Sequence, residues 1–138
     1  MKALFSIKEA LRNEANPLRI PQMEAYMRNQ FPFYGVMSTP RKEILKTLKK
    51  DQLDVLDTTE KRTLIQLLWE EEHRECQLVA LEWLMTWKPK EFLASDIELL
   101  EWLITTKSWW DTVDGIAPNV VGKFARVFPE QMKEKLKQ

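Results

Sequence analysis

Glycine is scarce in this chain of 138 residues, with three in all, and cysteine and histidine occur once each. Sandwiches and barrels of β-strands need many tight turns, most of which use glycine, so this composition favours helices. A lone cysteine, Cys76, excludes an internal disulfide, and its apolar neighbours predict a small buried side chain. One histidine with no second Cys or His at metal spacing argues against a zinc site. We therefore expect no metal.

Long apolar runs are also missing, because no segment is apolar for long enough to cross a bilayer. Lys2, Lys8 and Glu9 place charge too early for the apolar core of a signal peptide. We therefore expect a cytoplasmic protein without a membrane partner. Glycine-rich phosphate-binding motifs and the GxSxG nucleophile motif are absent as well, and we expect no cofactor.

Charge is balanced overall, with 21 basic and 21 acidic residues, but it is unevenly distributed. Residues 1–50 carry ten basic and four acidic side chains, whereas residues 51–104 carry five and thirteen. A basic first third is typical of a surface that faces an anionic polymer. An ordinary solvated surface fits the same distribution, so charge alone leaves both interpretations open.

Apolar residues recur at helical spacing between proline and capping signals. We expect a first helix over residues 1–14 that Pro17 ends, and a second that Pro21 opens and that runs towards Asn29. A third is expected with Thr39 as N-cap and Pro40 at its first position.

The second half of the chain predicts further helices. Capping-box spacing occurs at residues 57–60, 95–98 and 108–111, and each box is expected to open a helix. Residues 73–87 form another helical segment, Pro118 is expected to bend the helix that contains it, and Pro129 opens a last helix towards Gln138.

The helix starts predict a repeat. Asp57 and Ser95 each begin a pair of helices about forty residues long, which is the period of HEAT or armadillo repeats. We predict an all-α fold of six to eight helices in antiparallel pairs. The expected architecture is an α–α superhelix with residues 1–138 as one helical-repeat domain. An ordinary helical bundle is the alternative.

The segment with the most chemical information runs from Lys107 to Asp114, with the sequence KSWWDTVD. Trp110 and Asp114 are four residues apart and therefore share one face of a helix. An aromatic ring beside a carboxylate binds and stabilises a cationic group. The same residue types also fit two tryptophans of the core and an acid on the surface, so the pattern by itself leaves both open.

Three blocks of the sequence together resemble the AlkD-like DNA alkylation repair glycosylases. They are the KSWWDTVD segment, the segment 26–36 followed by Thr39-Pro40-Arg41, and Leu68-Trp69 followed by residues 74–77. The blocks fall in the order and spacing of that family. The resemblance implies a HEAT-like solenoid whose concave basic face holds duplex DNA. It also implies hydrolysis of the N-glycosidic bond of N3- and N7-alkylated purines, without the base being pulled into a pocket.

By this resemblance Asp114 is the catalytic carboxylate, Trp110 lies against the sugar, and Tyr26 lines the lesion site. The surplus of Lys and Arg before Asp51 is expected to lie partly on the concave face, and we expect Arg41, Lys42 and Lys107 to contact phosphates. Trp109 is included in the predicted DNA-binding set.

Members of the family are substantially longer, so we expect this chain to lack their later repeats. We expect a monomer whose partner is duplex DNA with alkylated purines. A non-catalytic module that binds DNA or a protein is the alternative function.

Overall fold

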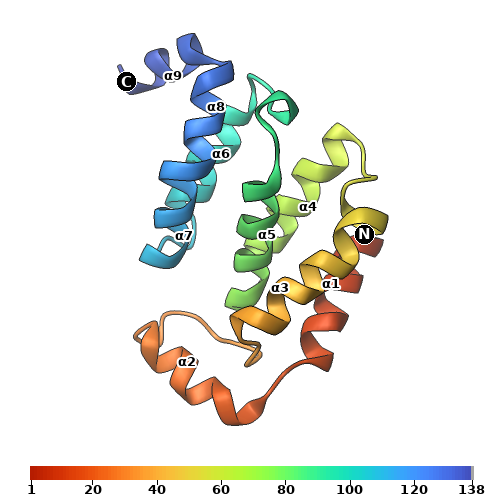
Figure 1. Ribbon diagram of the computed structural model, residues 1–138. Helices are drawn as coiled ribbons and strands as arrows, with labels where there is room; N and C mark the ends of the chain where they lie inside the picture. Colours follow the sequence, from red (N-terminus) through yellow and green to blue (C-terminus); the bar gives the residue numbers. More distant parts are fainter. Residues whose placement is uncertain (138) are drawn as a thin grey trace. The chain divides into compact units, whose positions relative to one another are not determined.

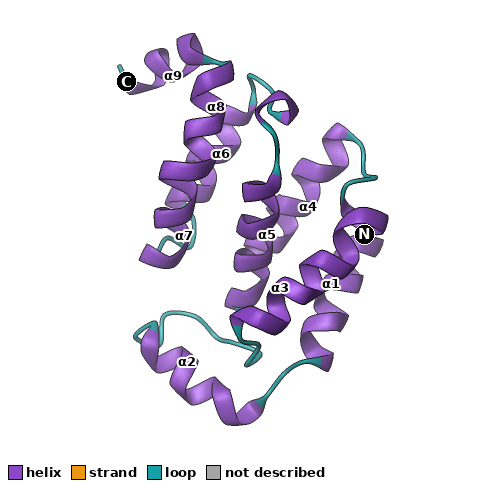
Figure 2. Ribbon diagram, viewed as in Figure 1, coloured by secondary structure: helices purple, strands orange, loops and turns teal. Residues whose placement is uncertain are grey.

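The computed structural model describes residues 1–137, and within that range it contains helices and no strand. Short turns and loops join the helices (Figures 1 and 2). When contiguous elements are counted together and the isolated 3-10 turn Pro89–Glu91 is left out, the described residues form eight helices. The predicted all-α class and number of helices are therefore confirmed. The α-helices are α1 (Lys2–Asn13), α2 (Ile20–Tyr26), α3 (Ser38–Leu48), α4 (Thr58–Glu70), α5 (Arg74–Thr86), α6 (Asp96–Thr105), α7 (Trp110–Gly115), α8 (Gly122–Val127) and α9 (Pro129–Leu136).

Four shorter helical elements complete the described chain. Two are 3-10 turns, η1 (Pro17–Arg19) and η3 (Pro89–Glu91), and two are π-helical, η2 (Lys49–Leu53) and η4 (Ile116–Val121). The chain folds as two compact units, which we name unit 1 (Met1–Glu82) and unit 2 (from Trp83 onward). Their boundary falls within α5. The assignment of residues 1–138 to a single domain stays a prediction.

The core of unit 1 is built on α1. Ala3, Ile7 and Leu11 recur at a spacing of four residues and are all buried. This helix packs on α3 and α4, whose buried residues are Ile44, Leu45, Leu64, Ile65, Leu68 and Trp69. Each large apolar side chain that is buried contributes roughly 1.5–3 kcal/mol, so packing of these faces is the main source of stability. Cys76 is fully buried in the same unit, as predicted.

An ion pair lies beside this core. Lys8 Nζ is 2.5 Å from Glu71 Oε1, and both side chains are mostly buried. The hydrogen bond with Glu71 raises the pKa of Lys8 above its ordinary value. The pair therefore ties α1 to the residue that follows α4, and it persists throughout the physiological pH range.

The core of unit 2 is a chain of aromatic rings. Successive ring centroids from Trp83 through Trp87, Phe92 and Phe124 to Phe128 lie 5.2–6.4 Å apart, within the usual range for packed aromatic pairs. This arrangement joins the end of α5 to α8. Lys123 on α8 adds a polar link, because its Nζ donates to the carbonyl oxygens of Met85 and Trp87 at 2.6 and 3.0 Å. The Met85 carbonyl lies in the last turn of α5 and therefore lacks a donor within that helix, and Trp87 directly follows α5.

The predicted helix caps were only partly right. The Asp57 capping box is confirmed: Asp57 Oδ1 accepts from the Glu60 N–H at 2.8 Å, and Glu60 Oε1 accepts from the Asp57 N–H at 3.1 Å. Ser95 is the N-cap of α6, but its side chain makes no capping hydrogen bond. Asp96 instead accepts from the Leu93 N–H at 2.8 Å.

Two other helix starts are shifted from their predicted positions. α7 begins one residue later than expected, with Trp109 as its N-cap, because the Ser108 hydroxyl donates back to the carbonyl of Ile104. α3 begins at Ser38 with Met37 as its N-cap, so Pro40 lies at its third position rather than its first. Pro21 lies at the start of α2 as predicted, although α2 ends at Tyr26 rather than near Asn29.

Candidate nucleic-acid interface

The two tryptophans of the KSWWDTVD segment lie in different environments. Lys107 adopts a left-handed backbone with φ of 53°, and the extended backbone of Trp109 then leads into α7. Trp109 is partly buried, whereas Trp110, the first residue of α7, keeps 48% of its surface exposed. Two core tryptophans would both be buried, so this geometry favours a role for Trp110 at the surface.

A row of four buried side chains runs along the helix that begins at Trp110. Thr112, Ile116, Val120 and Phe124 follow at a spacing of four residues, and all four are fully buried. In a regular α-helix such a row drifts by roughly 120° over three steps. The π-helical turn η4 adds one residue, or about 100° of rotation, and so returns the row to one face. Pro118 explains where the turn lies, because proline has no N–H to donate to the carbonyl of Asp114.

Trp110 and Asp114 lie on the side of α7 away from this buried row. Each is two residues from Thr112, which corresponds to a rotation of about 200° in either direction. Asp114 is exposed, in keeping with this position. Within residues 1–137 its carboxylate makes no hydrogen bond or ion pair. A carboxylate and an indole ring are thus presented together to solvent, an arrangement suited to a cationic group.

The predicted basic contacts differ in their surroundings. Arg41 Nε lies 2.6 Å from Glu82 Oε1, and the Arg41 side chain is only 12% exposed. A phosphate contact from Arg41 would therefore require this ion pair to open. Lys42, the next residue of α3, is exposed. Lys107 is partly buried and lies in the turn before α7.

Tyr26 ends α2 in unit 1 and keeps 69% of its surface exposed. Of the predicted set, unit 1 therefore carries Tyr26, Arg41 and Lys42, and unit 2 carries the residues of the KSWWDTVD segment. Within unit 2 the structure brings Trp110 and Asp114 together on one helix face. The functional roles predicted for all of these residues stay predictions.

The sequence did not predict a polar cluster at the start of α5. Glu75 is fully buried and accepts the N–H groups of Tyr34, Gly35 and Val36, each at 3.0 Å. Gln77 is also buried, and its Nε2 donates to the carbonyls of Leu68 and Glu71. The only signal was that residues 74–77 belong to one of the blocks that carry the family resemblance. Periodicity does not indicate which distant backbone groups such side chains bind.

Aromatic contacts complete this cluster. The Arg74 guanidinium lies 3.8 Å from the centre of the Phe31 ring, and the Arg74 N–H donates to the carbonyl of Pro32 at 2.9 Å. The Tyr34 ring stacks on His73 with centroids 3.8 Å apart. Burial raises the pKa of Tyr34, so its hydroxyl stays neutral at physiological pH. The segment 31–36 is therefore fixed to α5 by hydrogen bonds and by ring contacts.

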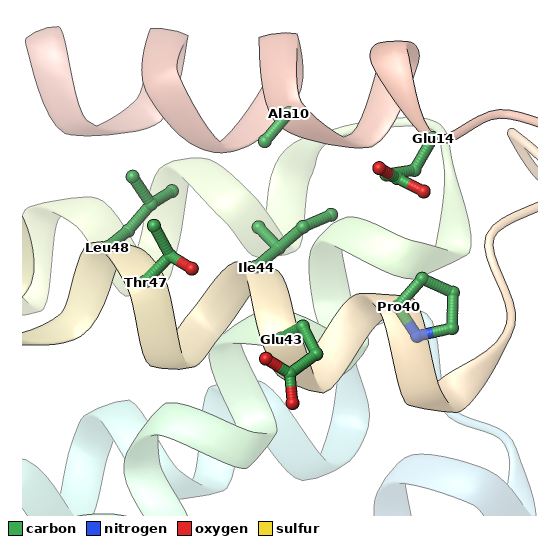
Figure 3. Close-up of a pocket in the computed structure, with 7 residues that line it drawn as sticks. All are labelled: Ala10, Glu14, Pro40, Glu43, Ile44, Thr47 and Leu48. Carbon is green, nitrogen blue, oxygen red and sulfur yellow. The ribbon is translucent and has the colours of Figure 1, made fainter.

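A cavity of about 380 Å³ lies between α1 and α3 in unit 1, and none of the predicted site residues lines it (Figure 3). Ala10, Ile44 and Leu48 give it an apolar lining, and Glu14 and Glu43 add two carboxylates. Carboxylates repel a phosphate backbone, so this cavity does not suit DNA.

Two other kinds of site are absent from the part of the chain that the structure describes. No group of three or more His, Cys, Asp or Glu side chains is arranged to hold a metal ion there. In the same residues, no helix combines the length and the apolar character needed to cross a membrane.

Similarity to known proteins agrees with the fold. A family model described as DNA alkylation repair enzyme matches residues 7–138. A solved structure, described as a predicted DNA alkylation repair enzyme from Enterococcus faecalis, is similar to this chain with a TM-score of 0.68 and 24% sequence identity. The similarity covers 88% of this chain and 54% of the other, so this chain spans about half the length of that protein. No curated protein matches the chain. The structural likeness confirms the predicted α–α superhelical class.

Proposed function

Because the chain belongs to the DNA alkylation repair enzyme family, we propose that it binds alkylated duplex DNA and hydrolyses the N-glycosidic bond of N3- and N7-alkylated purines. The observation that supports this proposal is the pair formed by Trp110 and Asp114. They share the exposed face of α7, and the Asp114 carboxylate has no structural partner within residues 1–137.

The chemistry explains why a single carboxylate suffices. An N3- or N7-alkylated purine is already cationic, so it leaves as a neutral base and needs no general acid. As the bond from C1′ to the base nitrogen breaks, positive charge develops on the deoxyribose, as in glycoside hydrolysis. A nearby carboxylate stabilises this charge. Water then forms the new bond to C1′ and loses a proton, which Asp114 accepts in this scheme.

Trp110 and the cationic side chains have supporting roles in the proposal. The exposed indole of Trp110 provides an apolar surface for the sugar beside the lesion. Lys42 and Lys107 contact phosphates, which fixes the position of the duplex without reading its sequence. Tyr26 lines the lesion site in the manner implied by the resemblance.

The test is release of base from a methylated duplex. The chain is incubated with a duplex that contains 7-methylguanine, and the free base is measured by chromatography. We expect release well above the rate in buffer, and no release from a matched duplex in which uracil, a neutral base, replaces the lesion. Release of the base no faster than in buffer would reject the proposed glycosylase activity. If the duplex is nevertheless bound, the chain is a non-catalytic DNA-binding module, whereas absence of binding at low salt would leave a protein-binding module.

A further inference from the structure

The helix that carries Tyr26, α2, contains no buried residue, although its C-cap Met27 is buried. Two hydrogen bonds join the α2 region to the segment Phe33–Val36, which we name the anchor segment. Glu24 Oε2 accepts the N–H of Phe33 at 3.0 Å, and the N–H of Asn16, just before η1, donates to the carbonyl of Gly35 at 3.2 Å. The position of α2 therefore depends on polar contacts with the anchor segment as well as on packing.

The anchor segment is itself rigidly placed. Three consecutive N–H groups in it donate to the buried carboxylate of Glu75 on α5. Gly35 has φ of 94°, which disfavours other residues, and a Cβ there would lie 2.3 Å from the carbonyl oxygen of Asn16. The backbones of these two segments thus approach too closely for a side chain at position 35, and the anchor segment holds the start of the α2 region in place.

Glu24 and Tyr26 point to opposite sides of α2. They are two residues apart, which corresponds to about 200° around the helix. Glu24 is partly buried with the neighbouring Met23, while Tyr26 is 69% exposed. A hydrogen bond on the inner side of a helix with no buried residue restrains its rotation, and this rotation decides where the outer side chain points.

We infer that Glu24 is a positioning residue for Tyr26: its hydrogen bond to the Phe33 N–H fixes the rotation of α2, so that Tyr26 is presented to DNA in one orientation. This inference rests on the proposed function, because it takes Tyr26 to contact the lesion. An aromatic side chain that is oriented before binding loses less conformational freedom on binding. Glu24 acts through the backbone of the anchor segment, and Glu75 holds that backbone in place.

Four variants test the inference: Glu24→Ala, Glu24→Gln, Tyr26→Ala and the double variant Glu24→Ala/Tyr26→Ala. Binding is measured by fluorescence anisotropy, as the preference for a duplex with one 7-methylguanine over the same duplex unmodified. We expect Glu24→Ala to reduce this preference about fivefold, the typical effect of one lost hydrogen bond. Glu24→Gln keeps an acceptor oxygen and should retain the preference.

The double variant separates positioning from a general loss of stability. If Glu24 acts through Tyr26, removing Glu24 has no further effect once Tyr26 is gone. Hydrogen exchange of the Phe33 amide gives an independent readout, and it should be faster in Glu24→Ala than in Glu24→Gln. Two results would overturn the inference. One is that the double variant loses as much binding preference as the two single variants together. The other is that Glu24→Ala keeps the preference while Tyr26→Ala loses it. Full preference in Tyr26→Ala would reject the proposed role of Tyr26, and this inference with it.

Discussion

At the scale of single residues, two carboxylates of this chain show opposite uses of the same group. Glu75 is fully buried and accepts three backbone N–H groups, which is the arrangement of a structural acceptor. Asp114 is exposed and makes no hydrogen bond or ion pair within residues 1–137. An acid whose charge the fold does not use is available for chemistry. The contrast supports a structural role for Glu75 and the catalytic role proposed for Asp114.

Glu75→Gln tests the structural half of this assignment. The amide turns an N–H₂ group towards backbone N–H groups, so at least one buried donor loses its acceptor. We expect a loss of roughly 2–4 kcal/mol in the free energy of unfolding, measured by urea denaturation. Glu72→Gln, at an exposed position three residues earlier, is the matched control and should change stability little. Equal stability of the two variants would contradict the account of Glu75.

Trp110 gives a prediction about binding. Trp110→Ala should weaken the affinity for duplex DNA with a lesion by roughly 1–3 kcal/mol, because the indole no longer packs on the nucleotide. Phe5→Ala removes an aromatic ring that is exposed to a similar extent in unit 1, and it should leave the affinity unchanged. The measurement is a titration monitored by anisotropy. Similar affinities for Trp110→Ala and the wild type would show that Trp110 is not part of the interface.

At the scale of elements, the π-helical turn η4 keeps a row of buried side chains on one helix face although the side chains are spaced four residues apart. Twelve residues separate Thr112 from Phe124, whereas about eleven residues of a regular α-helix would bring the two side chains to the same face. The π-helical turn accommodates the one extra residue. Deleting Pro118 removes this residue, and the row then keeps its face in a regular α-helix. With Pro118 present, the π-helical turn η4 thus sets the rotation of α7 about its axis relative to α8. This rotation decides which face of α7 presents Trp110 and Asp114.

Deletion of Pro118 should consequently be tolerated. We expect a midpoint of thermal unfolding within a few degrees of the wild type, about the effect of 1 kcal/mol or less. Deletion of Gln66, an exposed residue within the regular helix α4, is the control. It rotates Leu64 and Ile65 by about 100° relative to Leu68 and Trp69, and should lower the midpoint substantially. Equal losses for the two deletions would show that η4 does not correct the register.

Much of the order of the helices could be predicted from the sequence, whereas the hydrogen bonds at the helix caps could be predicted only in part. Asp57 formed its capping box because both of its partners lie within the same four residues. Ser108 does not form a capping box, because its hydroxyl donates to the carbonyl of Ile104 in the preceding helix. A short polar side chain can form a hydrogen bond with any of several nearby backbone groups, and the sequence does not show which of these hydrogen bonds is formed. The contacts of Glu75 were beyond prediction for a different reason, since they join segments about forty residues apart.

At the scale of the whole molecule, the formal net charge is zero while the first fifty residues carry a surplus of six positive charges. Affinity for a polyanion depends on which cations contact phosphates rather than on net charge. The exposed Lys42 is better placed for such a contact than Arg41, whose guanidinium is bound to Glu82. The proposed interface therefore depends on few cations, the exposed Lys42 and the partly buried Lys107.

Salt dependence tests this view of binding. A plot of log affinity for duplex DNA against log salt concentration should fall steeply, and Lys42→Ala should reduce its slope by about 0.9, the value for one phosphate contact. Lys2→Ala, also exposed in unit 1, is the matched control and should leave the slope unchanged. Equal slopes for the wild type and Lys42→Ala would exclude Lys42 from the interface.

The central claim is that the Asp114 carboxylate stabilises a cationic sugar, and the rate of 7-methylguanine release under single-turnover conditions tests it most directly. Asp114→Asn keeps the shape of the side chain but removes its charge. We expect the rate to fall by about two to three orders of magnitude, with thermal stability and DNA affinity nearly unchanged. Glu98→Gln, at an exposed acid on α6, should release the base at the wild-type rate. Release by Asp114→Asn at the wild-type rate would contradict the account.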